Sequence, residues 1–449
     1  DFLIFHISQM LSSRQRFILM CGLITGTFFF TVCVGPLFTL FLLKLGVREK
    51  IIGMLSILPS VVGVFSLWMI RSVAKNPVAN FINAAWKLFI IECCFLPVFI
   101  LAGILPSSII VVIFSLLLFI FYFPSQQYVY AWFPVIESVI PSHERGHFLG
   151  VLRIILTLAG YGLLLICSKI LGPDPDYWRF FFALLMIMVI SILFPVSLSR
   201  TGIPEIKKEL SEKIGFLDEF IEILSNKDHA AYFRFLAIWT FITGIAGPFL
   251  MPFYKTELGL STSFCINLAS VNTLGYGFSV FGWGRVVDRH GSRYVLFISC
   301  CLAVLHLLLL SHVHLFPDQW LKKFLLFISF FGGVVFAGQL MGDTTRRMAL
   351  CPQQNKSSYF AYMLVFGAQV PLIVASPLSG FVLQRYRDFQ SGFYGIYQSV
   401  MLLTGFLYLF LLYQILLMRP VKEKPVMELL KDDITESLLK LRDVIASPP

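Results

Sequence analysis

Residues 284–293 read Gly284-Arg285-Val286-Val287-Asp288-Arg289-His290-Gly291-Ser292-Arg293, a charged segment between two apolar stretches at about 264–287 and 294–313. Each stretch is long enough to cross the hydrocarbon core of a bilayer, which takes about 20 mostly apolar residues. Gly291 suits a tight turn, and Asp288 lies where the first helix is expected to end. The segment is therefore predicted to be a short loop at one membrane face, joining two transmembrane helices.

The rest of the chain has the same character. Of its 449 residues, 57% are hydrophobic and only 13% are charged, whereas soluble domains carry about 25% charged residues. Lipid must therefore be its main solvent. The fold class predicted is an all-α integral membrane protein, with twelve transmembrane helices in two six-helix bundles. The twelve apolar stretches lie at about 17–43, 51–70, 84–104, 108–136, 148–171, 178–198, 231–254, 264–287, 294–313, 320–345, 359–383 and 393–418.

Composition also excludes several classes of function. The net charge of +10 is expected from cytoplasmic loops, which collect Lys and Arg, so we expect no nucleic-acid partner. The nine cysteines are scattered and form no CxxC pair, so neither a metal site nor a disulfide framework is predicted. No Walker loop, HExxH motif or GxSxG elbow is present. We therefore expect no catalytic residues, no cofactor and no enzymatic activity.

The distribution of Lys and Arg predicts the orientation. If the N-terminus is cytoplasmic, the cytoplasmic segments hold most of these residues. We expect both termini in the cytoplasm and a multi-pass location in the cell (inner or plasma) membrane. The first apolar stretch is unsuited to signal-peptidase cleavage and is predicted to be a span. The cytoplasmic Lys and Arg of the short segments include Arg71, Lys75, Arg145, Arg285, Arg289, Arg293, Arg346 and Arg347.

Two polar stretches divide the chain. The prediction is an N-terminal bundle at 1–199, a linker at 200–230, a C-terminal bundle at 231–419 and a tail at 420–449. In the linker and the tail, apolar residues recur every three or four positions among charges of both signs, which predicts amphipathic helices. Such helices could lie on the membrane surface or against the bundle; the alternative is a regulatory or partner-binding helix.

The two halves resemble each other in order and spacing. Gly35-Pro36 in the first span corresponds to Gly247-Pro248 in the seventh, and Gly63 in the second to Gly277 in the eighth. Residues 141–160 lie in register with 352–371. A six-plus-six duplication is predicted. Parallel repeats recur in transporters, where solute binds near the midplane between halves that rock against each other.

The loop at 284–293 resembles the G-x-x-x-D-R-x-G-x-R loop of the major facilitator superfamily, and Pro141 to Gly146 is similar to its loop between spans four and five. The resemblance implies a secondary transporter with a cytoplasmic gate that breaks in the inward-facing state. The gate residues would be Gly284, where helices approach closely, Asp288, which could pair with Arg289, Arg293 or a helix dipole, and Gly291. The alternative is a simple turn with cytoplasmic arginines.

The chain also departs from that family pattern. The corresponding loop of the first half has Val73 and Ala74 where an aspartate and an arginine are expected. The fifth span reads Ala159-Gly160-Tyr161-Gly162 and lacks the Gly-Pro signature typical of drug–proton antiporters. No element like that of the sugar porters is present either. Both common substrate classes are therefore disfavoured.

Charged groups inside spans are candidates for function because burying them is costly. Glu92 and Asp343 could each carry a coupled proton. The alternatives are pairing of Glu92 with Lys87, and of Asp343 with Arg346 or Arg347. Arg153 could attract an anionic solute, or extend to the cytoplasmic surface.

Uncharged polar groups at the same depth could bind solute or bond helices together. The remaining candidates for solute contact are Gln126, Gln127, Tyr130, Trp239, Asn267, Asn272, Gln339 and Gln369. The sequence thus predicts a monomeric secondary transporter whose partners are the bilayer, a small organic metabolite or anion, and a proton if transport is coupled. The alternatives are an exporter of amphipathic compounds, or a non-transporting sensor or scaffold.

Overall fold

The computed structural model describes residues 14–140, 145–203, 216–352, 356–387, 390–391 and 394–419. Within these residues, twelve helical segments are long and apolar enough to cross a membrane, and each overlaps one predicted stretch. The prediction of twelve spans in an all-α membrane fold is confirmed. The segments are Arg16–Lys44, Glu49–Trp68, Pro77–Leu101, Ser107–Ile136, Gly150–Leu171, Tyr177–Ser199, Lys227–Glu257, Thr262–His290, Ser292–Ser311, Asp318–Leu350, Tyr359–Arg385 and Ile396–Leu417.

The third span begins seven residues earlier than the apolar stretch suggested. Its helix starts at Pro77. Proline suits the first position of a helix because a backbone N–H at that position would make no hydrogen bond within the helix. The amide of Asn80 bonds back to the carbonyl of Asn76 at 2.8 Å, so the polar first turns belong to the helix. Hydropathy alone excluded these residues.

The first six spans are built from residues 14–199. Several spans consist of more than one helical element because the backbone changes its pitch along the way. The elements are α2 (Arg14–Phe28), η1 (Phe29–Leu37), α3 (Phe38–Lys44), α4 (Glu49–Ser56), α5 (Leu58–Phe65), η2 (Ser66–Trp68), α6 (Met69–Lys75), α7 (Pro77–Leu101), α8 (Ser107–Val139), α9 (Arg145–Leu171), α10 (Tyr177–Ser191) and α11 (Leu193–Ser199).

The last six spans follow a short helix, α12 (Phe216–Ser225), in the predicted linker. Residues 204–215 of that linker, the tail from 420 onward and residues 141–144 lie outside the described residues, so the predictions made for them stay predictions. The elements are α13 (Lys227–Ala246), η3 (Gly247–Phe249), α14 (Leu250–Pro252), η4 (Phe253–Glu257), α15 (Thr262–His290), α16 (Ser292–Ser311), η5 (Val313–Leu315), α17 (Asp318–Leu350), α18 (Lys356–Tyr362), η6 (Met363–Gln369), α19 (Val370–Arg385), the strands β1 (Gln390–Ser391) and β2 (Tyr394–Gly395), and α20 (Ile396–Leu417).

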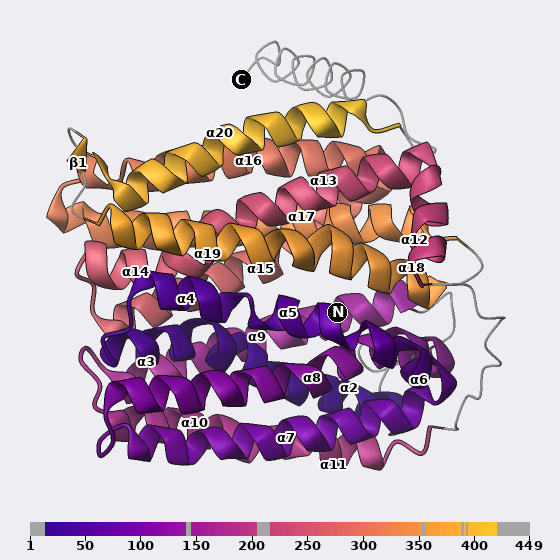
Figure 1. The fold of residues 1–449 in the computed structure, drawn as a ribbon, viewed down its shortest axis with the longest axis horizontal. Coiled ribbons are helices and arrows are strands. Elements are labelled where there is room, and N and C mark those ends of the chain that lie inside the picture. The colour runs from indigo at the N-terminus through magenta and orange to yellow at the C-terminus, as the bar shows by residue number, and fades with distance from the viewer. Residues whose placement is uncertain are drawn as a thin grey trace, which may run out of the picture.

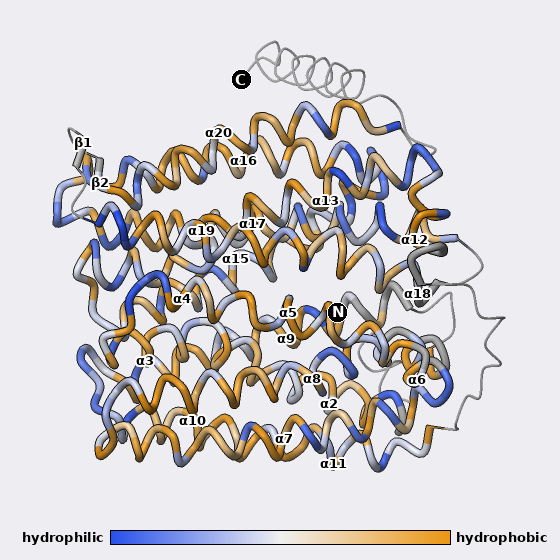
Figure 2. The backbone as a smooth tube through the Cα atoms, viewed as in Figure 1, coloured by the Kyte–Doolittle hydropathy of each residue, from blue (hydrophilic) through white to orange (hydrophobic). Residues whose placement is uncertain are grey.

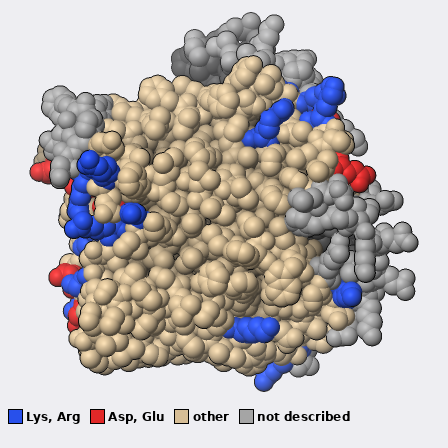
Figure 3. All heavy atoms as spheres, in the orientation of Figure 1, with Lys and Arg blue, Asp and Glu red and all other residues tan. Residues whose placement is uncertain are grey.

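The helices lie side by side in two groups. Residues 14–203 form the lower group in Figure 1 and residues 216–419 the upper group. Loops 45–48 and 172–176 lie at one end of the bundle, which we call the predicted external face. Helices α6, α12 and α18 lie at the other end, the predicted cytoplasmic face. Apolar residues dominate the helices between the two ends (Figure 2), and Figure 3 shows Lys and Arg mostly at the edges of a wide uncharged surface.

Aromatic side chains fill the core of the first group. Phe38 on α3 has its ring centroid 5.0 Å from Phe95 and 4.9 Å from Phe114, so it joins α3, α7 and α8. Phe41 lies 4.3 Å from Phe99 in the same way. These rings are almost fully buried. Burial of such rings, and their edge-to-face contacts, holds this bundle together.

Small residues allow the helices of the second group to pack closely against each other. A Cβ added at Gly275 on α15 would lie 2.1 Å from the carbonyl oxygen of Phe330, and one at Gly333 on α17 would lie 2.0 Å from that of Asn272. The backbones of α15 and α17 therefore touch, and no larger residue fits between them. This is the packing that membrane helices use where apolar burial gives no driving force.

The two Gly-Pro pairs of the repeat interrupt their helices. Pro36 lies inside the π-helical turn η1, and Pro248 lies in the 3₁₀ turn η3. A proline supplies no N–H, so the carbonyl four residues earlier loses its partner. In the seventh span, Ser376 on α19 donates to the carbonyl of Gly244 at 3.0 Å, and Ser379 donates to that of Ile245 at 2.7 Å. The break is thus satisfied by a neighbouring span.

We predict that Ser376→Ala and Ser379→Ala each lower stability by about 1–3 kcal/mol, because a carbonyl is left unpaired in the membrane interior. Thermal unfolding of the purified protein in detergent measures the loss. Ser115→Ala is the matched control, because the Ser115 hydroxyl bonds only to Val111 of its own helix. Equal melting temperatures for the Ser376 and Ser115 variants would contradict the prediction.

Candidate solute site

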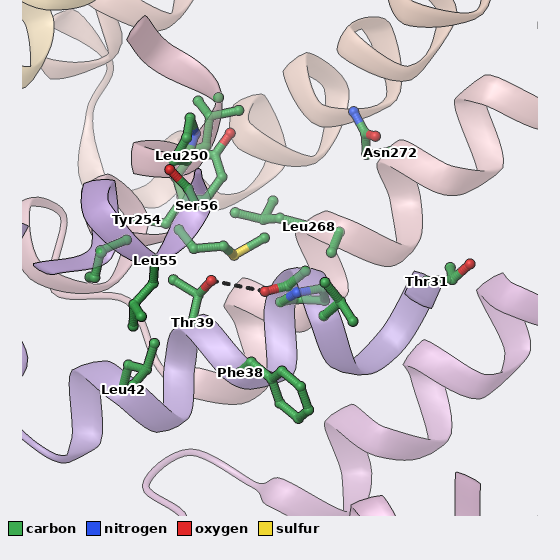
Figure 4. A pocket seen from close by; sticks show the side chains of 18 of the residues that line it. Thr31, Phe38, Thr39, Leu42, Leu55, Ser56, Leu250, Tyr254, Leu268 and Asn272 are labelled. Carbon is green, nitrogen blue, oxygen red and sulfur yellow. Dashed lines mark hydrogen bonds between the residues drawn. The ribbon is translucent and has the colours of Figure 1, made fainter. Parts of the chain in front are cut away.

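A cavity of about 530 Å³ lies between the two helix groups (Figure 4). Small-molecule sites typically measure about 300–1,000 Å³. The first group lines it with Thr31, Val34, Gly35, Pro36, Phe38, Thr39, Leu42, Ile52, Leu55, Ser56, Pro59, Phe114, Leu118, Tyr122 and Leu164. The second group lines it with Gly247, Pro248, Leu250, Met251, Tyr254, Leu268, Ala269, Asn272, Thr273 and Ser329.

Both helix breaks line this cavity. Gly35-Pro36 comes from one group and Gly247-Pro248 from the other. Irregular backbone is tolerated at membrane depth where it is buried in protein or lines a cavity. Thr39 donates to the carbonyl of Gly35 at 2.9 Å, the bond drawn in Figure 4. The repeated sequence motif therefore bends the first and seventh spans at the wall of the same space.

The wall is mostly apolar and carries no charge. None of the described residues that line the cavity is charged, and Phe38, Phe114, Leu118, Leu250 and Met251 supply apolar surface. Most of the polar lining groups have partners in the protein. Ser56 bonds to Gly53, and Thr273 bonds to Ala269. The cavity suits a molecule with an apolar body.

Backbone hydrogen bonds close the cavity toward the predicted external face. The N–H of Thr262 donates to the carbonyl of Pro173, and that of Ser263 to the carbonyl of Gly172, both at 3.0 Å. Ser168 adds a bond to the carbonyl of Ser263 at 2.9 Å. These bonds join the loop after α9 to the start of α15, which belong to different helix groups.

The loop after α9 is held in place within its own group. Lys44 lies 2.9 Å from Asp174 at the protein surface. The hydrogen bond from the Lys44 ammonium, together with its charge, lowers the pKa of the exposed Asp174 carboxyl. An exposed pair of this kind contributes little to stability, so we assign it the role of orienting the loop.

A second contact closes the same face between α4 and the last two spans. Tyr397 on α20 donates to the buried carboxyl of Glu49 at 3.0 Å. A Cβ added at Gly53 would lie 2.6 Å from the carbonyl oxygen of Ser376, and one at Gly380 would lie 2.7 Å from that of Glu49. The helix groups therefore touch backbone to backbone here.

Toward the predicted cytoplasmic face, two further contacts bound the cavity. Gln369 on η6 donates to Gln126 on α8 at 3.4 Å, and Gln126 donates to the carbonyl of Pro59 at 3.2 Å. A Cβ added at Gly63 would collide with Gln369, and one at Gly277 would lie 2.2 Å from Thr157. The paired glycines of the repeat thus lie at the two contacts between the groups.

Several predicted solute contacts instead join helices within one group. Gln127 donates to Asn80 at 2.7 Å, and Tyr130 bonds to Ser66 and to the carbonyl of Gly63. These bonds connect α8 to its neighbours in the first group, and neither side chain lines the cavity.

Gln339 has the same role in the second group. It accepts from Trp239 on α13 at 3.3 Å and donates to Tyr408 on α20 at 3.3 Å. Trp239 and Tyr408 are both buried. Because Gln339 is engaged on both sides, it serves as a cross-link among three spans, away from the lining of the cavity.

Two of the predicted candidates on α15 differ from each other. Asn272 lines the cavity, and its amide nitrogen donates to the carbonyl of Ser329 at 3.0 Å. Its amide oxygen has no partner among the described residues. Asn267 is partly buried and does not line the cavity.

Arg153 crosses between the groups on the cytoplasmic side of the cavity. Its guanidinium lies 3.3 Å from the sulfur of Met341 on α17. A thioether is a weak acceptor, so this contact is easily broken. The structure thus places Arg153 at the interface between the groups, one turn from Thr157, and outside the cavity lining.

Glu92 is buried inside the first group. One of its carboxyl oxygens is enclosed and makes no hydrogen bond to any described residue. The expected alternative, pairing with Lys87, is absent from the described contacts. The thiols of Cys33 on η1 and Cys93 on its own helix interact electrostatically with this carboxyl. Glu92 therefore lies behind the broken part of the first span.

Asp343 is paired with Arg347, which was the alternative to a role in proton coupling. It forms a salt bridge with Arg347 at 2.6 Å and accepts from Tyr232 on α13 at 2.5 Å. Arg347 also donates to Tyr232 at 3.1 Å. This closed triad joins α13 to α17, and its charges compensate each other.

The predicted loop at 284–293 is almost entirely helical: α15 continues to His290 and α16 begins at Ser292, so the turn is made by Gly291 alone. Gly291 has φ +87°, a conformation that favours glycine, so the predicted turn is confirmed. Arg293 is buried and donates to the last carbonyls of α20, Ile415 and Leu416. Asp288 is exposed and has no described partner, while Arg289 is also exposed.

The close helix approach expected at Gly284 is not present. A Cβ added there would meet only the end of Met341, at 4.0 Å. The close approaches of α15 lie further from the loop, at Gly275 and Gly277.

Sequence reasoning missed four residues that the structure places at the cavity or its closure. Thr31 and Tyr122 line the cavity. Glu49 and Tyr397 form the bond at the external face. An acidic residue at the start of an apolar stretch was a signal for Glu49, but its partner is 348 residues away.

Comparison with known proteins identifies the fold. Residues 235–449 match the sequence model of the Major Facilitator Superfamily. No curated protein matches the chain by sequence.

Solved structures resemble the chain along nearly its full length. One is the nucleoside transporter NupG, with TM-score 0.65 and 14% identity over 92% of this chain and 100% of that one. Another is a D-xylose–proton symporter, with TM-score 0.62 and 15% identity over 90% and 97%. A third is a bacterial homologue of the iron transporter ferroportin in its inward-facing state, with TM-score 0.60 and 12% identity over 92% and 99%. At these identities the likeness establishes the fold alone.

We predict that Tyr397→Phe shifts the protein toward opening at the predicted external face. Loss of one hydrogen bond, about 1 kcal/mol, changes the ratio of open to closed states about fivefold. Labelling of a Ser56→Cys variant by a membrane-impermeant maleimide reports the change. Tyr413→Phe is the control, because Tyr413 lies exposed on the same helix. Unchanged labelling in the Tyr397 variant would count against a gate at this contact.

Proposed function

We propose that the chain is a secondary transporter of the major facilitator type, which moves a small solute by alternating access. The match of residues 235–449 to that superfamily and the twelve helical segments able to cross a membrane support the proposal. The observation that carries the proposal is the cavity between the two helix groups, with separate contacts on either side of it. If those contacts open in turn, solute passes from one face to the other without a continuous channel.

The contacts on both sides are suited to opening. They include a few hydrogen bonds, and glycines that lie against the backbone or a side chain of the other group. Hydrogen bonds that break can be replaced by bonds to water, so each contributes only about 0.5–1.5 kcal/mol net. The two states can therefore lie within a few kcal/mol of each other, as exchange requires.

Residues 284–293, where α15 turns into α16, support an assignment of state. The resemblance implies a cytoplasmic gate that is broken when the transporter faces inward. Asp288 has no described partner while the predicted external face is closed by bonds between the groups. We therefore assign this conformation to a state closed at the predicted external face, in which the Gln126–Gln369 and Thr157–Gly277 contacts still bound the cavity toward the cytoplasm, with both termini in the cytoplasm.

Of the two candidate acids, Glu92 is the better candidate for a coupled proton. Asp343 has its charge compensated by Arg347, whereas Glu92 has no cationic partner and one enclosed oxygen. An unpaired buried carboxylate is costly, and a protonated one is much less so. Glu92 lies behind η1, so its protonation could alter the span that lines the cavity.

The competing proposals make different demands on the protein. A non-transporting sensor or scaffold would bind a partner and show no solute flux. An exporter of amphipathic compounds would extrude lipophilic solutes. Purified protein in proteoliposomes, assayed for accumulation and counterflow of labelled solutes, tests all three. Absence of flux from well-folded protein, together with specific capture of a protein partner, would favour the scaffold.

We predict that Asp288→Asn reduces uptake about fivefold, the effect of losing one interaction of about 1 kcal/mol in the closed gate. Membrane insertion and expression should be unchanged, because Asp288 is exposed here. Asp318→Asn, an exposed acid at the opposite end of the bundle, is the matched control. Uptake at the wild-type rate in the Asp288 variant would argue against a gate.

We predict that Glu92→Gln abolishes the dependence of solute accumulation on a proton gradient and preserves counterflow of solute. Glutamine keeps the shape of a neutral carboxyl and removes its titration. Accumulation is measured in proteoliposomes with and without an imposed pH gradient. Glu222→Gln, an exposed acid on α12, is the control. A gradient dependence that survives in the Glu92 variant would exclude Glu92 as the coupling site.

A further inference from the structure

We propose that the solute is an uncharged molecule with an apolar body and hydrogen-bonding groups directed at both halves of the protein. It would bind between Thr31 and Tyr122 of the first helix group and Asn272 of the second. This inference rests on the proposed function, because it names the class of solute that the same cavity would carry.

The absence of charge from the described lining is the first argument. A charged group leaves water at a cost of several kcal/mol, which a site offsets only with a paired charge or several hydrogen bonds. The cavity lining offers no such charge. An organic anion, one of the solutes expected from the sequence, would therefore bind poorly here.

The charged candidates from the sequence are all engaged elsewhere or lie outside the lining. Arg153 contacts Met341 on the cytoplasmic side of the cavity. Asp343 is occupied by Arg347 and Tyr232. Glu92 lies behind η1, within the first helix group. None of them lines the cavity.

The polar groups that remain free are the second argument. The hydroxyls of Thr31 and Tyr122 make no hydrogen bond within the part of the chain that the structure describes, and both residues line the cavity. Asn272 uses its amide nitrogen on Ser329 and keeps its oxygen available. Thr31 and Asn272 come from different helix groups (Figure 4).

The other polar lining residues have partners within the protein. The hydroxyls of Thr39, Ser56 and Thr273 each bond a carbonyl of their own span, and the side chains of Tyr254 and Ser329 interact with each other. Unused hydroxyl and amide groups facing an apolar cavity are the pattern of a site that fixes a ligand's orientation. The two hydroxyls can donate or accept, and the amide oxygen accepts, so the solute needs at least one donor.

The test compares matched pairs of probes that share a skeleton and differ in charge. Nicotinamide is compared with nicotinate, and uridine with uridine monophosphate. Each is tested for thermal stabilisation of the purified full chain, since a ligand that binds only the folded state raises its stability. The expected result is stabilisation by uncharged members, with at least tenfold weaker binding of their charged partners.

Two variants test the assigned contacts. Thr31→Val and Tyr122→Phe keep side-chain volume and remove a free hydroxyl. Each should therefore weaken binding of the uncharged probe about three- to tenfold. The matched controls are Thr25→Val, on the same span with its hydroxyl bonded to Cys21 and Gly22, and Tyr128→Phe, on α8 away from the cavity. Neither control should change the affinity.

The outcomes separate this inference from the proposed function. The inference is overturned if only charged probes bind, or if no uncharged probe stabilises the protein. Flux of any solute would still uphold the transport proposal. Uncharged binding that is insensitive to Thr31→Val and Tyr122→Phe also overturns the assigned site. Uncharged binding that both variants weaken, without flux in proteoliposomes, upholds the solute class and overturns the transport proposal.

Discussion

The architecture depends on one constraint: inside a bilayer no water is present to bond a backbone group, so every break in a helix needs a partner from the protein. The chain breaks its first and seventh spans at Gly35-Pro36 and Gly247-Pro248. In the seventh, Ser376 and Ser379 of a neighbouring span supply the missing donors. Because irregular backbone is tolerated beside a cavity, the same two breaks define where the cavity lies.

The two helix groups meet through a small number of discrete contacts around that cavity. Glycine allows backbones to touch at Gly53 and Gly380 on one side, and lets the side chain of Thr157 lie against Gly277 on the other. Hydrogen bonds such as Tyr397 to Glu49 lie beside the first of these contacts. A contact of this kind has few intermediate arrangements, since close-packed backbones either touch or separate. This makes an exchange between two states more natural than a gradual deformation.

Charge is distributed so that the centre stays neutral. The second group compensates Asp343 with Arg347, and the first group buries Glu92 away from the cavity. The low dielectric of the membrane makes each uncompensated charge expensive, so the position of Glu92 suggests a purpose other than packing. At the proposed site, recognition would rest on hydroxyl and amide groups, whose individual contributions are modest and therefore compatible with release.

The sequence by itself determined the number of spans, the repeat and the glycine turn at Gly291, because these depend on hydropathy and on local backbone chemistry. It also singled out Gln126, Gln369 and Asn272, which lie at the cavity or its boundary. Only the tertiary structure separated these from Gln127, Trp239 and Gln339, which bond helices together. The physical reason is that hydropathy shows a residue's depth along a span but not which neighbour its side chain faces. Glu49 and Tyr397 illustrate this, because a bond across 348 residues leaves no local pattern.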